Sequence, residues 1–263
     1  MRTIYQTLAL LVLFSVAACS GAGSSNSAVP AGSMSAQAPA QTQSRALQKH
    51  TKPGAGGYTL FGDGILVHPG FNSPTAAQAS YSADGAYGGV DFAFPAGATY
   101  SQLQNLSADY QFTIGSCGDG APRFVVTLTN GTATGNATFY FGPPPNFTLC
   151  PPNVWSNTGN LASLPHTVDD SQLPGGTFYD PYTTSQTKFG NYAITDVFVV
   201  VDGFSAFRTV QWDNVGVTIG SDNETYTFES ADSCKDGGWQ QFTSSPGPFK
   251  NQGDCVSYFN NGK

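Results

Sequence analysis

The residues that could carry catalysis are few and scattered along this chain. Glycoside hydrolysis needs two carboxylates flanking the scissile bond, one of them with a raised pKa. Glu224 and Glu229 are the only glutamates, and both lie in a polar stretch near the C-terminus. There is no Gly-x-Ser-x-Gly turn to present a serine nucleophile, and the cysteines and three histidines form no closely spaced zinc set. We therefore expect no enzyme here, and a hydrolase is the third choice among the functions considered.

Aromatic residues in Pro- and Gly-rich stretches indicate a different chemistry, the binding of sugars. A flat ring covers the apolar C–H face of a sugar while nearby amides and carboxylates orient its hydroxyls. Trp212 alternates out of phase with Val215, Val217 and Ile219, which would place it on the solvent face unless a bulge intervenes. Alternatively, such rings fasten long loops onto the fold. The ligand-binding candidates are Trp155, Tyr179, Asp180, Tyr182 and Trp212.

Oxygen-rich positions could also hold calcium, which takes carboxylate, amide and carbonyl ligands. No segment matches an ordered calcium-binding loop, and aspartate is common in turns because its short side chain caps backbone N–H groups. The aspartates are therefore expected either to hold a structural calcium or to have ordinary turn and capping roles. The candidate aspartates are Asp63, Asp91 and Asp213, with Asp169 and Asp170 as further possibilities; no other cofactor is expected.

The first residues resemble a signal peptide for export. One arginine is followed by a short apolar run, too short to span a bilayer, and then by small residues. Val16-Ala17-Ala18-Cys19 resembles a bacterial lipobox, so residues 1–18 are expected to be a signal peptide and Cys19 the lipid attachment site. Plain secretion is the alternative. Residues 19–57 then form a lipidated N-terminus and a disordered tether rich in Ser, Ala, Gly and Pro, or alternatively a folded pro-segment.

Five cysteines are an odd number for an exported protein. Assigning Cys19 to lipid leaves Cys117, Cys150, Cys234 and Cys255, which allow three pairings. Cys117 and Cys150 flank an expected strand pair, and Cys234 and Cys255 are close together in the C-terminal segment. We expect the disulfides Cys117–Cys150 and Cys234–Cys255, formed in an oxidising compartment.

Composition favours a secreted β-protein over a cytosolic helical enzyme. Charged residues are only 10% of the chain and the net charge is −7, so nucleic acid is excluded as a partner, and the membrane is contacted only through the lipid anchor.

Short aromatic or β-branched runs bounded by turn residues predict a single all-β domain over residues 58–230, a two-sheet sandwich of jelly-roll type by preference. Residues 231–263 are expected to form a small disulfide-closed lobe. The predicted strands are Tyr58–Val67, Gly89–Phe94, Ala108–Ile114, Arg123–Leu128, Thr138–Phe141, Ile194–Val201, Val210–Ile219 and Tyr226–Glu229, with no amphipathic helix longer than about two turns.

Two family resemblances accompany this prediction. The C-terminal pattern Cys-Lys-x-Gly-Gly-Trp followed by Phe-Lys-Asn-Gln-Gly-Asp-Cys-Val, over residues 234–256, resembles the tail of secreted bacterial proteins of unassigned function. That resemblance, which extends over roughly residues 100–259, implies a fold and a location but no activity. Separately, the stretch over residues 210–217, with Asp-Asn-Val-x-Val, resembles the last strand of carbohydrate-binding jelly-roll modules, which often hold a structural calcium.

These observations together predict an exported surface lipoprotein with a non-catalytic recognition domain. A glycan or cell-wall polysaccharide is the expected ligand. The alternative is a structural or adhesive surface protein that contacts other proteins.

Overall fold

The computed structural model describes residues 48–49, 57–82, 85–203 and 206–261, which all belong to one compact unit. The expected signal peptide, Cys19 and most of the expected tether lie outside the described residues. Among the helices that the structure describes, none is long and apolar enough to cross a membrane.

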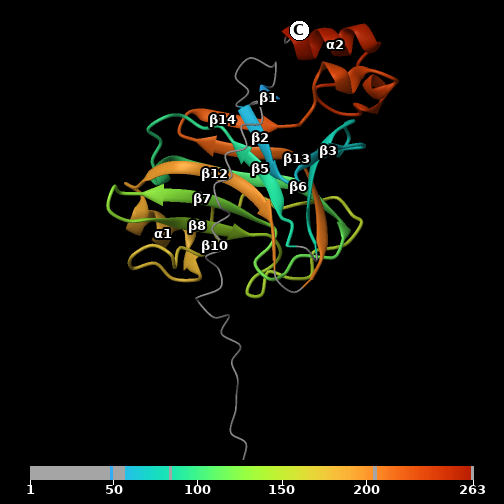
Figure 1. Cartoon of the computed structure of the whole chain (residues 1–263). Helices are drawn as coiled ribbons and strands as arrows, with labels where there is room; N and C mark the ends of the chain where they lie inside the picture. The colour runs from blue at the N-terminus through green and yellow to red at the C-terminus, as the bar shows by residue number, and fades with distance from the viewer. Residues whose placement is uncertain (1–47, 50–56, 83–84, 204–205, 262–263) are drawn as a thin grey trace, which may run out of the picture. The chain divides into compact units, whose positions relative to one another are not determined.

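Two antiparallel sheets make up the fold (Figure 1). The first sheet has the order β1-β2-β5-β12-β7-β8, with bounds Gln48–Lys49, Gly57–Gly62, Gly88–Phe92, Ala193–Val201, Arg123–Thr129 and Thr134–Tyr140. The second has the order β3-β4-β13-β6-β9, with bounds Ile65–Val67, Ala76–Tyr81, Arg208–Ile219, Leu103–Ile114 and Ser156–Asn157; β14 (Asp222–Tyr226) also pairs with β13. Consecutive strands such as β4 and β5, or β6 and β7, lie in opposite sheets, so the chain crosses the core repeatedly.

One apolar core lies between the two sheets, as the alternating strands require. Phe92 in β5 packs on Tyr226 in β14 with ring centroids 4.7 Å apart, and Tyr110 in β6 packs on Phe141 beyond the end of β8 at 5.2 Å. The predicted all-β sandwich is confirmed, while its jelly-roll subtype stays a prediction. β4 was missed because its sequence, Ala-Ala-Gln-Ala-Ser-Tyr, has small residues in place of the β-branched ones that indicate strands.

Short elements cover one end of the sandwich. The paired strands β10 (Thr167–Val168) and β11 (Asp180–Pro181) lead into the helix α1 (Tyr182–Phe189), and η1 (Tyr100–Gln102) precedes β6. The disulfide Cys117–Cys150 joins the loop after β6 to the loop after β8.

The C-terminal lobe (residues 231–261) contains η2 (Ala231–Cys234), η3 (Gly238–Gln241) and α2 (Gln252–Asn261). It has its own small core, in which Cys234, Phe242, Cys255 and Phe259 are buried and Trp239 and Phe249 pack against them. The disulfide Cys234–Cys255 closes it, so both disulfides have the pairing expected from the sequence. The ten residues of α2 make it longer than the two turns that the sequence pattern predicted.

Candidate functional site

Asp213 lies at a point where the outer face of the second sheet is covered. Val210 and Trp212 point into the core, so Gln211 and Asp213 project from the other face of β13. Gln211 is half-buried, whereas Asp213 is fully buried. The residues that cover it, 68–75, connect β3 to β4, and we call them the covering loop.

The covering loop is fastened onto the Asp213 carboxylate. The Phe71 N–H and the Ser73 hydroxyl each donate to Oδ2 over 2.8 Å, and the Asn214 N–H donates to Oδ1 over 2.8 Å. A Cβ at Gly70 would lie 2.7 Å from Asp213 Oδ2 and 2.5 Å from Ser73 Oγ. Glycine is therefore required for the loop to approach the carboxylate this closely.

A second buried carboxylate, that of Glu229, stands beside Asp213. Glu229 follows β14 and is 2% exposed. Ser73, Thr227 and the backbone at Thr75 act to lower its pKa, yet among the described residues neither Oε atom has a hydrogen bond of normal geometry. Burial is the largest effect and raises the pKa of Glu229 to about 7. Burial, followed by the charge of Glu229, raises the pKa of Asp213 well above its usual range.

Asp213 and Glu229, which we call the acid pair, offer carboxylate oxygens, the type of ligand that calcium takes. Two charged carboxylates buried beside each other are costly, and either protonation or a divalent cation removes that cost. Asp213 Oδ1 keeps acceptor capacity, and Ser73 supplies a hydroxyl oxygen. Among the described residues, neither Glu229 oxygen has a hydrogen bond of normal geometry. Within the described part of the chain, no three His, Cys, Asp or Glu side chains group as metal ligands. Calcium here would therefore need backbone or hydroxyl oxygens to complete its ligands, as it commonly does.

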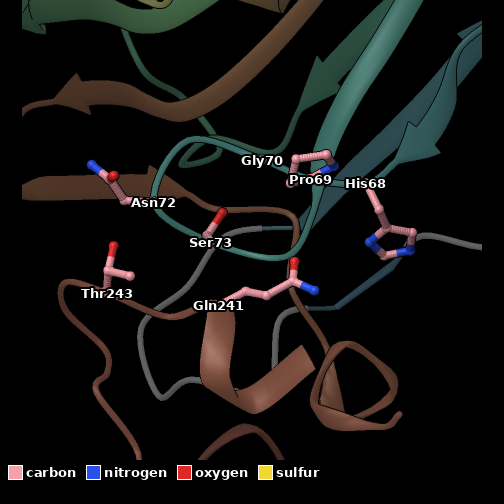
Figure 2. Close-up of a pocket in the computed structure, with 7 residues that line it drawn as sticks. All are labelled: His68, Pro69, Gly70, Asn72, Ser73, Gln241 and Thr243. Carbon is pink, nitrogen blue, oxygen red and sulfur yellow. The ribbon is translucent and has the colours of Figure 1, made fainter. Parts of the chain in front are cut away.

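A pocket of about 510 Å³ opens on the other side of the covering loop. His68, Pro69, Gly70, Asn72 and Ser73 line it from the loop, and Gln241 and Thr243 from the C-terminal lobe. Figure 2 shows the loop residues above the two lobe residues, with the pocket between them. Its side chains are an imidazole, two amides and two hydroxyls, so it offers polar but uncharged contacts.

An aromatic pair is attached to the same loop. Phe71, between the pocket residues Gly70 and Asn72, packs on the half-buried Trp155 with ring centroids 5.6 Å apart and an interplanar angle of 40°. Trp155 directly precedes β9, which pairs with β6. At that pairing, Asp109 accepts hydrogen bonds of 2.8 Å from the side-chain amides of Asn157 and Asn214. An apolar ring surface and a network of amides and carboxylate therefore lie next to each other.

The structure corrects the expected exposure of Trp212. The strand register shifts between Asp213 and Gly216, and Asn214 has a φ of 46°. This bulge resets the alternation, so Trp212 faces the core together with Val215 and is 0% exposed. Trp212 is therefore excluded as a surface ring for a ligand.

The candidate ligand-binding stretch over residues 179–182 contains both exposed and buried residues. Tyr182 is not in a loop but opens α1, is 5% exposed, and donates its hydroxyl to the Leu103 carbonyl. Asp180 is buried and pairs with Lys188. Tyr179 alone is open to solvent, at 52%, and stacks on Phe147 with centroids 5.7 Å apart. In this stretch, one aromatic ring is therefore available to a ligand, and it does not form an aromatic platform with Tyr182.

The remaining calcium candidates lie outside the acid pair, and most of them accept hydrogen bonds that hold turns or loops. Asp63 accepts from the Ser80 N–H with both oxygens, at 3.1 and 3.0 Å, and so ties the turn after β2 to β4. Asp91 in β5 interacts with Asp196 in β12. Asp169 accepts from Tyr140 and Ser171, and Asp170 from the Thr177 N–H, so these two aspartates hold loops.

Sequence reasoning missed Glu229 as a partner of Asp213, and it missed Phe71, Asn72, Gln241 and Thr243 altogether. No local pattern marks these residues, because the site joins segments far apart in the chain: Phe71 and Asp213 are separated by 142 positions. Gly70, followed shortly by Ser73 and Pro74, was the one signal of a tight loop.

No protein-family model and no curated protein matches this chain. Among solved structures, the family 11 carbohydrate-binding module of the cellulosomal cellulase Lic26A-Cel5E of Clostridium thermocellum is similar, with 13% identity, a TM-score of 0.36, and coverage of 67% of this chain and 97% of that one. An exo-beta-agarase is similar with 12% identity and a TM-score of 0.32, over 64% of this chain and only 24% of the agarase. At these levels of similarity, neither protein assigns a ligand or an activity to this chain.

Proposed function

We propose that this domain recognises a glycan without transforming it. The observation that carries the proposal is the Phe71–Trp155 pair, which stands beside the Asp109–Asn157–Asn214 network and on the loop that forms the pocket. Sugars need both kinds of surface, because their C–H faces are apolar and their edges carry hydroxyls. The acid pair is buried beneath the covering loop rather than exposed beside the rings, which argues against these two carboxylates flanking a scissile bond there.

Each part of the site has its own task in this proposal. Trp155 and Phe71 cover one sugar face and exclude water from it. The Asn157 amide, oriented by Asp109, is placed to meet sugar hydroxyls at the edge of the ring pair. Asp213 holds the covering loop in its bound shape before the glycan arrives, which reduces the entropy lost on binding. A calcium ion held by the acid pair would neutralise the charges of the two carboxylates.

Glycan binding by the whole chain is tested with an array of bacterial and plant polysaccharides, followed by titration calorimetry. Trp155→Ala is expected to weaken binding about five- to thirtyfold, because a stacked ring contributes on the order of 1–2 kcal/mol. Tyr179→Ala is the matched control, since this ring is exposed in a different loop. Equal binding by Trp155→Ala and the unchanged chain would place recognition elsewhere.

We also propose that the domain is exported and anchored by lipid at Cys19. The two disulfides support folding in an oxidising compartment, and Val16-Ala17-Ala18-Cys19 supports lipid attachment. Cys19→Ala is expected to move the protein from the membrane fraction to the soluble fraction of the producing bacterium. Persistence of the variant in the membrane fraction would reject the anchor.

A second candidate function is contact with another protein. Ile114 at the end of β6 and Phe207 just before β13 are each 57% exposed, and the backbone at Gly115 lies against Phe207. Large exposed apolar residues at neighbouring strand ends are compatible with a protein contact. An absence of binding across the glycan array, with a folded domain, would favour this function.

A further inference from the structure

We propose that the pocket between the covering loop and the C-terminal lobe binds a terminal, uncharged sugar residue, and that its affinity is coupled to a cation at the acid pair. This inference rests on the proposed function and extends it. It gives the lobe a part in recognition, and it assigns His68, Asn72, Ser73, Gln241 and Thr243 to a subsite separate from the aromatic pair.

The pocket is held together by contacts between its two parts. The Thr243 N–H donates to the Asn72 carbonyl over 3.1 Å, and the hydroxyls of Thr75 and Ser233 are 2.9 Å apart. On the lobe side, the disulfide Cys234–Cys255 and a separate apolar core keep Gln241 and Thr243 in place. Two hydrogen bonds therefore tie the lobe to the covering loop beside the pocket.

The chemistry of the walls selects a neutral, hydroxyl-rich molecule. Neither a carboxylate nor a cationic side chain lines the pocket in the described structure. His68 Nδ1 donates to the Pro74 carbonyl, so in the neutral imidazole Nε2 can accept from a ligand hydroxyl. The amides of Asn72 and Gln241 offer both donors and acceptors, which matches the dual character of sugar hydroxyls. A volume of about 510 Å³ lies within the range of small-molecule sites.

The pocket and the acid pair share one loop. Ser73 lines the pocket and donates to Asp213 Oδ2, while Gly70 lines the pocket and packs against the same oxygen. A cation that fixes the two carboxylates therefore also fixes this wall of the pocket. Coupling between two binding sites is reciprocal, so sugar in the pocket must raise the affinity for the cation by the same factor.

The experiment titrates the whole chain with the soluble hexasaccharides of β-1,4-glucose, β-1,4-xylose and β-1,4-N-acetylglucosamine, in calcium and in chelator. Gln241→Ala and Thr243→Val are compared with Gln240→Ala, a neighbouring exposed residue that does not line the pocket. We expect the two pocket variants to weaken hexasaccharide binding about tenfold, roughly the loss of one hydrogen bond. Gln240→Ala should bind as the unchanged chain does, and chelator should weaken binding at least threefold.

Calcium alone provides an independent measurement. Gln241→Ala should bind calcium as the unchanged chain does, and Glu229→Gln should bind it at least tenfold more weakly. Binding that depends on Trp155 but not on Gln241 or Thr243 would overturn this inference and leave the proposed function in place. Binding that is unchanged by chelator would overturn the coupling. Failure of the folded, unchanged chain to bind any hexasaccharide or polysaccharide would overturn both proposals.

Discussion

Trp155 and Trp212 have similar sequence surroundings but opposite roles, and the backbone around each residue causes the difference. Trp155 stands at the start of a two-residue strand on the edge of the second sheet, where it is half-buried against Phe71. Trp212 lies in the central strand of that sheet, opposite Ala77 and Tyr110, and is completely buried. The first ring is available to a ligand, whereas the second stabilises the fold.

Substitution of Trp212 should therefore affect stability. Trp212→Ala is expected to lower the free energy of unfolding by about 3–5 kcal/mol, because it removes a fully buried ring and leaves a cavity. Trp212→Phe should cost less than half as much, since the indole N–H has no hydrogen-bond partner among the described residues. Chemical denaturation measures both changes. A loss for Trp155→Ala as large as that for Trp212→Ala would contradict this assignment.

At the scale of elements, the pairing of β5 with β12 brings two aspartates together on the outer face of the first sheet. Asp91 is opposite Phe198, two positions from Asp196. Burial, then the charge of Asp196 and a hydrogen bond between the two carboxyl groups, raises the pKa of Asp91 to about 7. Like charges on adjacent strands are unfavourable, so these carboxyl groups share a proton below neutral pH.

Asp196→Asn is expected to lower the pKa of Asp91, because the neighbouring negative charge is removed and an amide donor takes its place. The effect of burial remains, so the pKa of Asp91 should stay above that of an exposed aspartate. NMR titration of the Asp91 carboxyl carbon measures this change. Asp232→Asn, in the C-terminal lobe, is the control that should leave the titration unaltered. An Asp91 titration that is the same in Asp196→Asn would refute the proton-sharing pair.

At the scale of the whole molecule, buried acids give the stability a definite pH dependence. The pKa values of Asp91, Asp170, Asp196, Asp213 and Glu229 are all raised, mainly by burial, while the pKa of Asp180 is lowered through its bonds to Lys188, Thr177 and Asp170. A raised pKa means that the folded protein keeps its proton when the unfolded chain has already released it. The five raised groups therefore contribute stability that is present below the usual pKa range of carboxyl groups and is lost as pH rises through about 7, where Asp91 and Glu229 titrate, while Asp180 contributes in the opposite sense.

In chelator, the melting temperature at pH 8 should be lower than at pH 5, and calcium should restore it at pH 8. Calcium at a hundredfold excess over its Kd adds about 2.7 kcal/mol, which corresponds to about 5–10 °C for a domain of this size. At pH 5 calcium should have less effect, because the acid pair holds a proton. Scanning calorimetry at both pH values checks this, with Glu229→Gln as the variant that should lose the calcium response. An equal response in that variant would place the cation elsewhere.

Local patterns in the sequence determined the all-β class, most of the strands and the two disulfides. Alternation along Asp109–Ile114 and the apolar run Val197–Val201 depend on residues next to one another, so the chain reveals them directly. Cysteine spacing likewise indicated the C-terminal lobe. The bulge after Asp213 could not be read in this way, because a left-handed Asn214 and a register shift depend on how β13 fits its neighbours.

Only the tertiary structure decided where a ligand could bind. Asp213 was a candidate from its sequence, but its burial comes from the covering loop 142 positions away and its electrostatics from Glu229 in another segment. The pocket needs both the covering loop and the C-terminal lobe, and the aromatic pair needs Phe71 and Trp155. Such sites arise when packing brings distant segments together, and neither composition nor periodicity carries information about contacts at that range.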